Sequence, residues 1–170
     1  MNSHTPRIYV CADLHFGHNN IIAYENRPFS SVEEMNEKLI ENWNQTVSQK
    51  DIVFVLGDVG FGSKEKLKSW VSQLNGRKSL IMGNHDRDKP IRFWQDAGFE
   101  FVSPFPIIYS YMGRKIEMMH EPPILLNPAR YILHGHVHGD PDYDFRGAST
   151  SCVCVERTDY RPILLEDAIR

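Results

Sequence analysis

The sequence predicts an α/β fold with two stacked β-sheets flanked by helices, and three observations support this prediction. Helical and strand patterns alternate in the first half of the chain, which is typical of parallel strands covered by helices. From residue 99 to 155 short strands separated by turn residues replace that alternation and indicate a second sheet. Asp, Asn or His follow five of the apolar runs, so we expect polar side chains to gather where strands end.

Three helices are predicted from their caps and from the spacing of apolar residues. The sequence Ser31-Val32-Glu33-Glu34 is a capping box, and apolar residues then recur every fourth position at Met35, Leu39, Trp43 and Val47. Ser63 begins a second helix, which ends before Gly76. Pro90 suits the first turn of a third helix, and Gly98 terminates it. Each helix follows an apolar run, as expected for successive strand–helix units.

The second half of the chain is predicted to be rich in short strands. We expect them over residues 99–102, 107–112, 115–119, 131–133 and 151–155. Five prolines between residues 103 and 129 exclude long helices there, because proline lacks a backbone donor and restricts the preceding residue. A short helix over residues 162–169 is expected to close the chain. The length of 170 residues fits one domain, residues 1–170.

Composition narrows the class of protein. A hydrophobic content of 41% and a charged content of 24% are those of an ordinary globular domain. The formal net charge of −3 argues against an extended nucleic-acid-binding surface, which requires clustered Lys and Arg. The three cysteines are interpreted as buried apolar residues rather than a disulfide scaffold. Because no export signal or membrane-spanning run is present, we expect a cytoplasmic protein; the sequence indicates no oligomeric state.

Metal-binding residue types follow five apolar runs. They are Asp13 and His15 after residues 8–12, Asp58 after 52–57, Asn84, His85 and Asp86 after 80–83, His120 after 116–119, and His136 and His138 after 131–135. A single Asp after a strand is usually a turn former, but turn chemistry gives no reason for His to follow these runs repeatedly. Oxygen and nitrogen ligands without Cys favour manganese first, with iron, zinc, cobalt or nickel as alternatives. The set exceeds the needs of one ion, so two divalent ions are predicted.

These residues resemble, in order, the motifs of the calcineurin-like metallophosphoesterase superfamily. The matching blocks are Asp13-x-His15, Gly57-Asp58, Gly83-Asn84-His85-Asp86, His120 and Gly135-His136-Val137-His138. The resemblance spans residues 8 to 162 and is closest to a small bacterial or phage-type member without a cap domain. It implies a four-layer αββα sandwich. It also implies that Asp13, His15 and His138 hold one ion, that Asn84, His120 and His136 hold the other, and that Asp58 bridges them.

The resemblance implies a phosphoester hydrolase in which a metal-bridging hydroxide attacks phosphorus. Metals bring the pKa of bound water to about 7, and two divalent ions with two carboxylates and one hydroxide leave a net charge of about +1 to attract phosphate. His85 is assigned to the leaving-group side, where it can donate a proton. We expect the partner to be a small phosphorylated substrate, with phosphodiesters or nucleotides favoured. A phosphomonoesterase, a nuclease and a non-catalytic protein-binding scaffold stay open as alternatives.

A few further residues near these motifs have two interpretations each. His18 either contacts substrate or caps the next helix. Arg87 and Arg27 are each either a phosphate clamp or a solvated surface charge, since the guanidinium fork fits phosphate oxygens. Asp86 is a possible orienting partner of His85, and His134 is interpreted as a buried hydrogen-bonding residue rather than a ligand.

Overall fold

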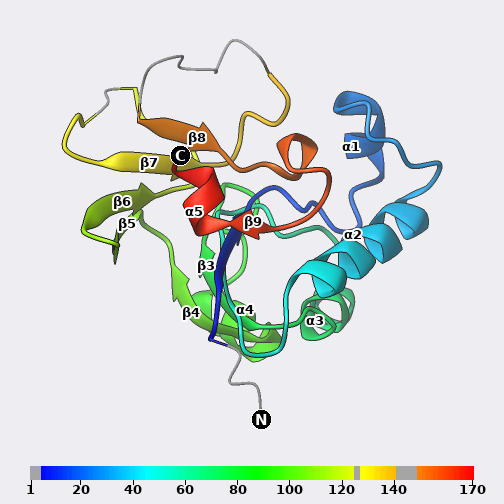
Figure 1. Cartoon of the computed structure of the whole chain (residues 1–170). Helices are drawn as coiled ribbons and strands as arrows, with labels where there is room; N and C mark the ends of the chain where they lie inside the picture. Colours follow the sequence, from blue (N-terminus) through cyan, green and yellow to red (C-terminus); the bar gives the residue numbers. More distant parts are fainter. Residues whose placement is uncertain (1–4, 125–126, 141–148) are drawn as a thin grey trace.

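The computed structural model describes residues 5–124, 127–140 and 149–170, and it contains two stacked sheets (Figure 1). The five-stranded sheet has the order β4-β3-β2-β1-β9, and the four-stranded sheet has the order β5-β6-β7-β8. The strands are β1 (Ile8–Cys11), β2 (Ile52–Val55), β3 (Arg77–Ile81), β4 (Phe99–Ser103), β5 (Ile107–Tyr111), β6 (Arg114–Met118), β7 (Tyr131–His134), β8 (Thr150–Cys152) and β9 (Ile163–Leu164). The predicted fold class, two sheets flanked by helices, is confirmed.

The first sheet is buried on both faces because its strands carry apolar residues at consecutive positions. Strands β1 to β4 are parallel, and paired side chains of neighbouring strands share a face, with one shift of register between β3 and β4 at Lys78 and Ser79. One face packs under the helices through Tyr9, Cys11, Val53, Val55 and Leu80. The other face meets the four-stranded sheet through Val10, Ala12, Phe54, Leu56 and Ile81. The two faces therefore contribute to two hydrophobic cores, one under the helices and one between the sheets.

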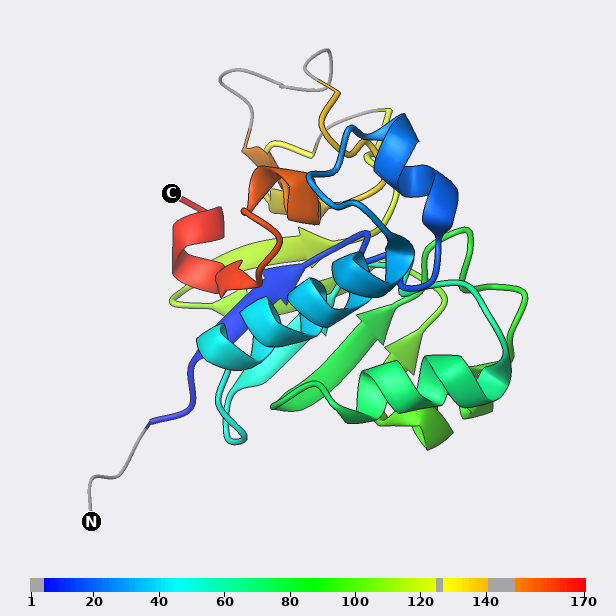
Figure 2. The ribbon, with the colours of Figure 1, turned by 90° about the vertical axis from the view of Figure 1, so that its right-hand side faces the viewer.

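Three helices cover the outer face of the five-stranded sheet (Figure 2). They are α2 (Val32–Thr46), α3 (Lys64–Ser72) and α4 (Ile91–Ala97). Ser31 and Ser63 cap the first two, accepting hydrogen bonds from the backbone N–H of Glu34 at 3.1 Å and of Lys66 at 3.3 Å. Gly98 ends α4 with a φ of 121°, as predicted from its position. A further short helix, α1 (Asn19–Tyr24), was not predicted.

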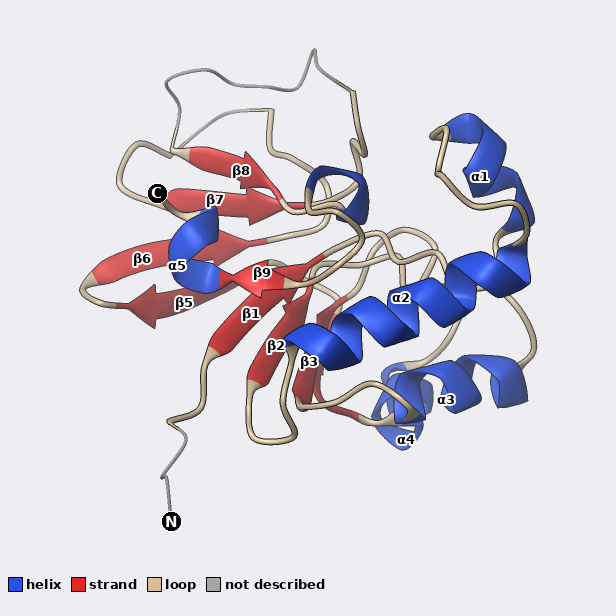
Figure 3. Cartoon of the chain, turned by 45° about the vertical axis from the view of Figure 1, so that its right-hand side comes forward, coloured by secondary structure: helices blue, strands red, loops and turns tan. Residues whose placement is uncertain are grey.

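The strand predicted over residues 151–155 is shorter than expected, since β8 ends at Cys152 and Val155 begins a turn of 3-10 helix, and two further elements differ from the prediction. The strand at residues 99–103, expected in the second sheet, is β4 and pairs in parallel with β3 at the edge of the first sheet. The helix expected over residues 162–169 begins with the short strand β9, antiparallel to β1, and only α5 (Leu165–Ala168) is helical (Figure 3). Edge pairing with β1 decides this conformation, because α5 then places Leu165 and Ala168 in the core between the sheets.

All three cysteines are free; Cys11 and Cys154 are buried, as expected, whereas Cys152 is only half-buried. Within the described ranges, no helix has the length and apolar content needed to cross a bilayer.

Candidate metal centre

The sequence-predicted site residues converge where strands of both sheets end. Asp13, Asp58 and Asn84 follow β1, β2 and β3, and the later histidines follow β6 and β7. Backbone hydrogen bonds fasten the first two loops to each other: the N–H of Asp13 donates to Gly57 O at 3.0 Å and that of His15 to Asp58 O at 3.1 Å. Parallel strands therefore deliver the side chains to one edge of the sandwich, as open α/β folds do.

One ligand group consists of Asp13, His15 and His138. Their ligand atoms all lie within 4.8 Å of one another. Nε2 of each histidine is 3.6 Å from Oδ1 of Asp13. Oδ1 of Asp13 and both ring nitrogens of His15 are buried and make no hydrogen bond among the described residues. Because unpaired buried polar atoms are costly, this group fits a cation that takes a lone pair from Oδ1 of Asp13 and one from a ring nitrogen of His15.

A second group consists of Asn84, His120 and His136. Nδ1–H of His120 donates to the Leu56 carbonyl at 2.8 Å, which turns Nε2 toward the site. That Nε2 lies 2.9 Å from Oδ1 of Asn84 and 3.2 Å from Nδ1 of His136. With its proton on Nδ1 alone, the ring offers a lone pair at Nε2 beside the Asn84 oxygen, and a cation can bind both. The donor set again fits a divalent metal.

Asp58 lies between the two groups. Its Oδ2 is 3.6 Å from Nε2 of His15 in the first group and 3.5 Å from Nε2 of His120 in the second. Burial, reinforced by the negative charge of Asp13, raises the pKa of Asp58 to about 6. Two buried carboxylates this close repel each other unless protons or cations intervene.

Burial also controls the protonation of the histidines. It lowers the pKa of His15 to about 4, which favours the neutral ring that metals require. For His138, burial would lower the pKa, but a hydrogen bond to Glu156 and the charge of Asp13 outweigh it and raise the pKa. Burial alone would raise the pKa of Asp13, yet the adjacent ring of His15 and the charges of His120 and His138 bring it below its usual range.

Several of these residues adopt the left-handed backbone conformation that non-glycine residues rarely use. The φ angles are 61° for Asp13, 53° for His15, 55° for Asp58, 72° for His136 and 46° for His138. Each such residue costs about 1–3 kcal/mol and persists only where its surroundings over-determine it. The loops at this edge therefore place their side chains in the site at a cost in the free energy of folding.

Two glycines permit the close packing of these loops. A Cβ on Gly83 would collide with Oδ1 and the backbone of Asp58, and a Cβ on Gly135 would collide with Oδ2 of Asp13. The same Oδ2 accepts a hydrogen bond from the N–H of His136 at 2.9 Å. The glycines before the Asn-His-Asp and His-Val-His blocks are thus required for backbone to approach the buried carboxylates.

His85 lies at the exposed side of the site, with its side chain 44% exposed and its Nε2 3.9 Å from Oδ2 of Asp58. Its backbone N–H donates to Oδ1 of the same carboxylate at 3.0 Å. The suggestion that Asp86 orients His85 is wrong. Asp86 is buried and instead accepts hydrogen bonds from the N–H groups of Asp58, Val59 and Gly83 at 2.8–2.9 Å. It holds the loops that carry Asp58 and Asn84.

The structure gives different outcomes for the residues that had two interpretations. His18 is at the N-cap of α1, yet its side chain makes no capping hydrogen bond and its ring lies 5.4 Å from that of His15. Arg87 is half exposed, 3.6 Å from Glu121, and lines a cavity beside His120. Arg27 is neither a surface charge nor a phosphate clamp, because its guanidinium is buried against the loop of Asp13. His134 is buried, and its Nδ1–H donates to the Gly135 carbonyl, as expected.

Sequence reasoning missed a buried ion pair behind the site. Arg27 donates to the carbonyls of Asp13 at 2.8 Å and Leu14 at 2.9 Å. Its Nε and Nη2 donate to Oε1 of Glu156 at 2.9 and 2.6 Å, and the same oxygen accepts from Nδ1–H of His138 at 3.0 Å. The pair therefore joins the loops of Asp13 and His138. No local signal marked Glu156, which follows an apolar run as an ordinary exposed Glu would.

Cys154 also reaches the site. Its thiol donates to Oδ2 of Asp13 at 3.1 Å, and burial raises its pKa well above the usual range. The interpretation of Cys154 as a buried residue was correct, but not its treatment as a purely apolar one.

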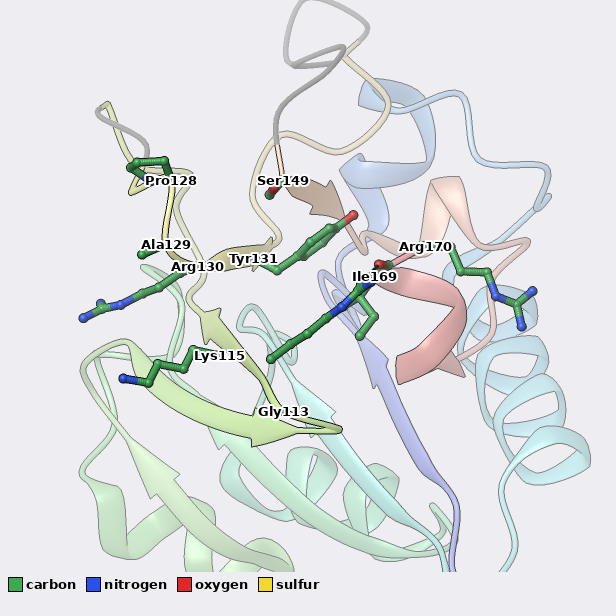
Figure 4. Close-up of a pocket in the computed structure, with 10 residues that line it drawn as sticks. Gly113, Lys115, Pro128, Ala129, Arg130, Tyr131, Ser149, Ile169 and Arg170 are labelled. Carbon is green, nitrogen blue, oxygen red and sulfur yellow. Dashed lines mark hydrogen bonds between the residues drawn. The ribbon is translucent and has the colours of Figure 1, made fainter.

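Cavities flank the proposed ligands on two sides. One of about 240 Å³ contains Arg87, Phe105 and His120. Another of about 530 Å³ contains Tyr24, His136 and His138. A separate cavity of about 690 Å³ lies between the Gly113 turn, Tyr131 and the last residues of the chain, and Figure 4 shows Lys115 and Arg130 pointing to the same side there. It contains none of the predicted site residues.

Comparison of the sequence with known protein families agrees with this arrangement of acidic, amide and imidazole side chains at the strand ends. The family described as calcineurin-like phosphoesterase matches residues 6–124. The chain belongs to this family. A calcineurin-like phosphoesterase is a metal-dependent hydrolase of phosphoesters, and the two ligand groups supply places for the divalent ions that the family implies. The match ends before His136, whose place in the site rests on the contacts given above.

Relatives extend the likeness over the rest of the chain. The uncharacterized protein MJ1445 of Methanocaldococcus jannaschii is 39% identical over 168 residues, covering 94% of this chain and 88% of that protein. The gene 66 protein of Mycobacterium phage L5 is 28% identical over 162 residues, covering 76% of each. A crystal structure of AQ665 from Aquifex aeolicus, a protein of unknown function, has a TM-score of 0.74 at 26% identity and covers 96% of this chain and 97% of that one.

Proposed function

We propose that this phosphoesterase uses two divalent ions, with manganese the first choice, to hydrolyse small phosphodiesters or nucleotides. The position of Asp58 carries the proposal, because its Oδ2 lies almost equally far from a histidine of each ligand group. Asp13, His15 and His138 would hold one ion, and Asn84, His120 and His136 the other. When bound, the ions supply an activated water and neutralise the charge that develops on the phosphoryl oxygens.

The remaining residues of the site orient groups and move a proton. His85 is exposed and adjoins Asp58, so its imidazole is placed to donate a proton to a departing oxygen. Its backbone N–H donates to Oδ1 of Asp58 and so fixes the orientation of that carboxylate. Arg87, on the His120 side, offers a guanidinium for a phosphate oxygen if its weak pairing with Glu121 opens.

A substrate panel tests this function. The purified protein is assayed with an aryl phosphodiester, an aryl phosphomonoester and single-stranded DNA, with and without added manganese. We expect manganese-dependent turnover of the diester that exceeds turnover of the monoester and the DNA. Preference for the monoester would replace the proposal with a phosphatase, and preference for DNA with binding that weakens steeply in salt would replace it with a nuclease. No turnover of any of the three substrates after metal loading would favour a non-catalytic protein-binding scaffold.

A matched variant separates metal-centre activity from contamination. Asp58→Asn removes the shared carboxylate and should abolish turnover, whereas Glu100→Gln changes an exposed acidic residue that is paired with Arg77 and should leave turnover nearly unchanged. Residual activity of equal size in both variants would show that another protein in the preparation is responsible.

A further inference from the structure

A groove adjoins the proposed ligands on the side of α1. Its volume is about 530 Å³, within the range of sites that enclose a small organic ligand. One wall is the end of α1 and the turn after it, Tyr24, Glu25 and Asn26, and the other is the loop from His136 to Asp140. Because His136 and His138 belong to both the groove and the proposed ligand set, a substituent of a phosphoester bound at the centre would enter the groove directly.

Tyr24 contributes an aromatic ring to the lining of the groove, and the residue is 68% exposed. A row of ring contacts leads to it from the metal centre: His15 stacks on Phe61 at 5.7 Å, Phe61 lies 4.5 Å from His18, and His18 meets the ring of Tyr24 at 6.3 Å and 77°. The row connects the exposed ring of Tyr24 to His15, a buried residue of the proposed ligand set. A planar heterocycle placed against such a ring gains about tenfold or more in affinity.

The polar groups of the groove disfavour a negatively charged substituent and favour one that carries hydrogen-bond donors. Glu25 and Asp140 bring carboxylates, and Asn26 brings an amide that can donate and accept. Two carboxylates disfavour a second phosphate or a nucleic-acid backbone here. They suit a neutral substituent that carries N–H donors, as the edge of a nucleobase does. The opposite cavity is smaller, about 240 Å³, and holds the cation Arg87 instead.

We propose that this groove binds the nucleoside part of the substrate, with the base against Tyr24 and its polar edge toward Asn26 and the groove carboxylates. The inference rests on the proposed phosphodiesterase or nucleotidase function and names the substrate class of that site. Glycerol or alkyl phosphoesters lack the ring that the groove accommodates. The enzyme accordingly discriminates between phosphoesters by the substituent rather than by the phosphoryl group.

Two substrates that differ only in this substituent test the proposal. The p-nitrophenyl ester of thymidine 5′-phosphate and methyl p-nitrophenyl phosphate share their leaving group and charge. For the manganese-loaded protein we expect kcat/KM to favour the thymidine ester by about tenfold or more. Tyr24→Ala should bring this ratio close to one, and Tyr24→Phe should preserve it, because stacking needs the ring and not the hydroxyl.

Phe105→Ala is the matched control, since Phe105 is a comparably exposed aromatic, 72%, on the opposite cavity. The ratio should be unchanged in Phe105→Ala. A wild-type ratio near one, or loss of the preference in Phe105→Ala instead of Tyr24→Ala, would overturn the proposal.

A binding measurement separates failure of the groove from failure of the proposed function. Calorimetric titration with thymidine 5′-phosphate is carried out on the wild-type protein and on Tyr24→Ala. Suppose that neither ester is hydrolysed, but the nucleotide binds and Tyr24→Ala weakens its binding by about tenfold. The phosphodiesterase proposal then fails, and the proposal that the groove binds a nucleoside is supported. Equal affinity in the two proteins, or no binding to either, overturns the groove.

Discussion

Replacing Glu156 with Gln should loosen two ligand loops at once. Oε1 of Glu156 accepts from Nε and Nη2 of Arg27 and from Nδ1–H of His138. Arg27 in turn holds the carbonyls of Asp13 and Leu14. The side chain of Arg27 is 0% exposed and that of Glu156 is 7% exposed. Glu156→Gln keeps the shape but leaves the buried guanidinium without its counter-charge.

The burial of this pair determines the size of the effect. Removing one partner of a buried ion pair costs about 3–5 kcal/mol, and because Gln retains an oxygen acceptor we expect about 3 kcal/mol. For a chain of this length that corresponds to a fall in Tm of about 6–12 °C. Loss of a carboxylate that orients a metal-binding histidine weakens metal affinity by about 10- to 100-fold. His138 should be the ligand affected, because its Nδ1–H loses the charged acceptor that fixes its tautomer.

The assay compares Glu156→Gln with Glu100→Gln. Glu100 pairs with Arg77 at 3.0 Å, but these side chains are 53% and 62% exposed, so solvent screens the pair and the control should lose little stability. Urea unfolding of the metal-free proteins gives the stability difference, and manganese titration followed by calorimetry gives the affinity. Equal losses in the two variants, or wild-type manganese affinity in Glu156→Gln, would refute the view that the pair positions the ligand loops.

Three further predictions concern the proposed centre. Asp58→Asn should lower the metal content of both sites, whereas His120→Ala should retain about one ion per chain, as measured by elemental analysis; equal loss would contradict bridging by Asp58. His85→Ala should keep the metals and lose about 10²- to 10⁴-fold in kcat with alkyl esters but less with p-nitrophenyl esters, so equal losses with both would remove its proton-donating role. Burial raises the pKa of Asp58 to about 6, so its protonated form contributes stability at low pH that is lost as pH rises through 6. Urea midpoints of the metal-free protein at pH 5 and 7 should therefore differ more than those of Asp58→Asn, and an equal difference would exclude Asp58 as the cause.

The strand ends could be predicted from the sequence because both signals for them are local. Short apolar runs indicate buried strands, and the residue type after each run indicates the chemistry at the sheet edge. Asp13, Asp58 and His120 were accordingly predicted at their observed positions, and the structure brings them together. The helices of the first sheet were predicted for a similar reason, since caps such as Ser31 act within one turn.

The pairing of edge strands could not be predicted, because it depends on partners distant in sequence. A strand as short as Ile163–Leu164 has no periodicity of its own, and only its pairing with Tyr9 and Val10 makes it extended. The same holds for the strand Phe99–Ser103. Its sequence pattern predicts a strand but does not indicate which of the two sheets the strand joins.

The function of Arg27 shows why a buried charge is the hardest feature to infer. Nothing within several residues of Arg27 indicates burial, since its counter-ion Glu156 is 129 residues away in the chain. Neither residue is favourable in the core alone, because each carries a desolvation cost that only the other offsets. The pair is therefore explained by the ligand loops that it joins. These loops contain Asp13, His15 and His138 in left-handed backbone conformations. Such conformations are strained and persist only where surrounding contacts hold them. A rigid charged anchor behind them keeps the strained backbone in place, and the resulting convergence of lone pairs is what a metal ion requires.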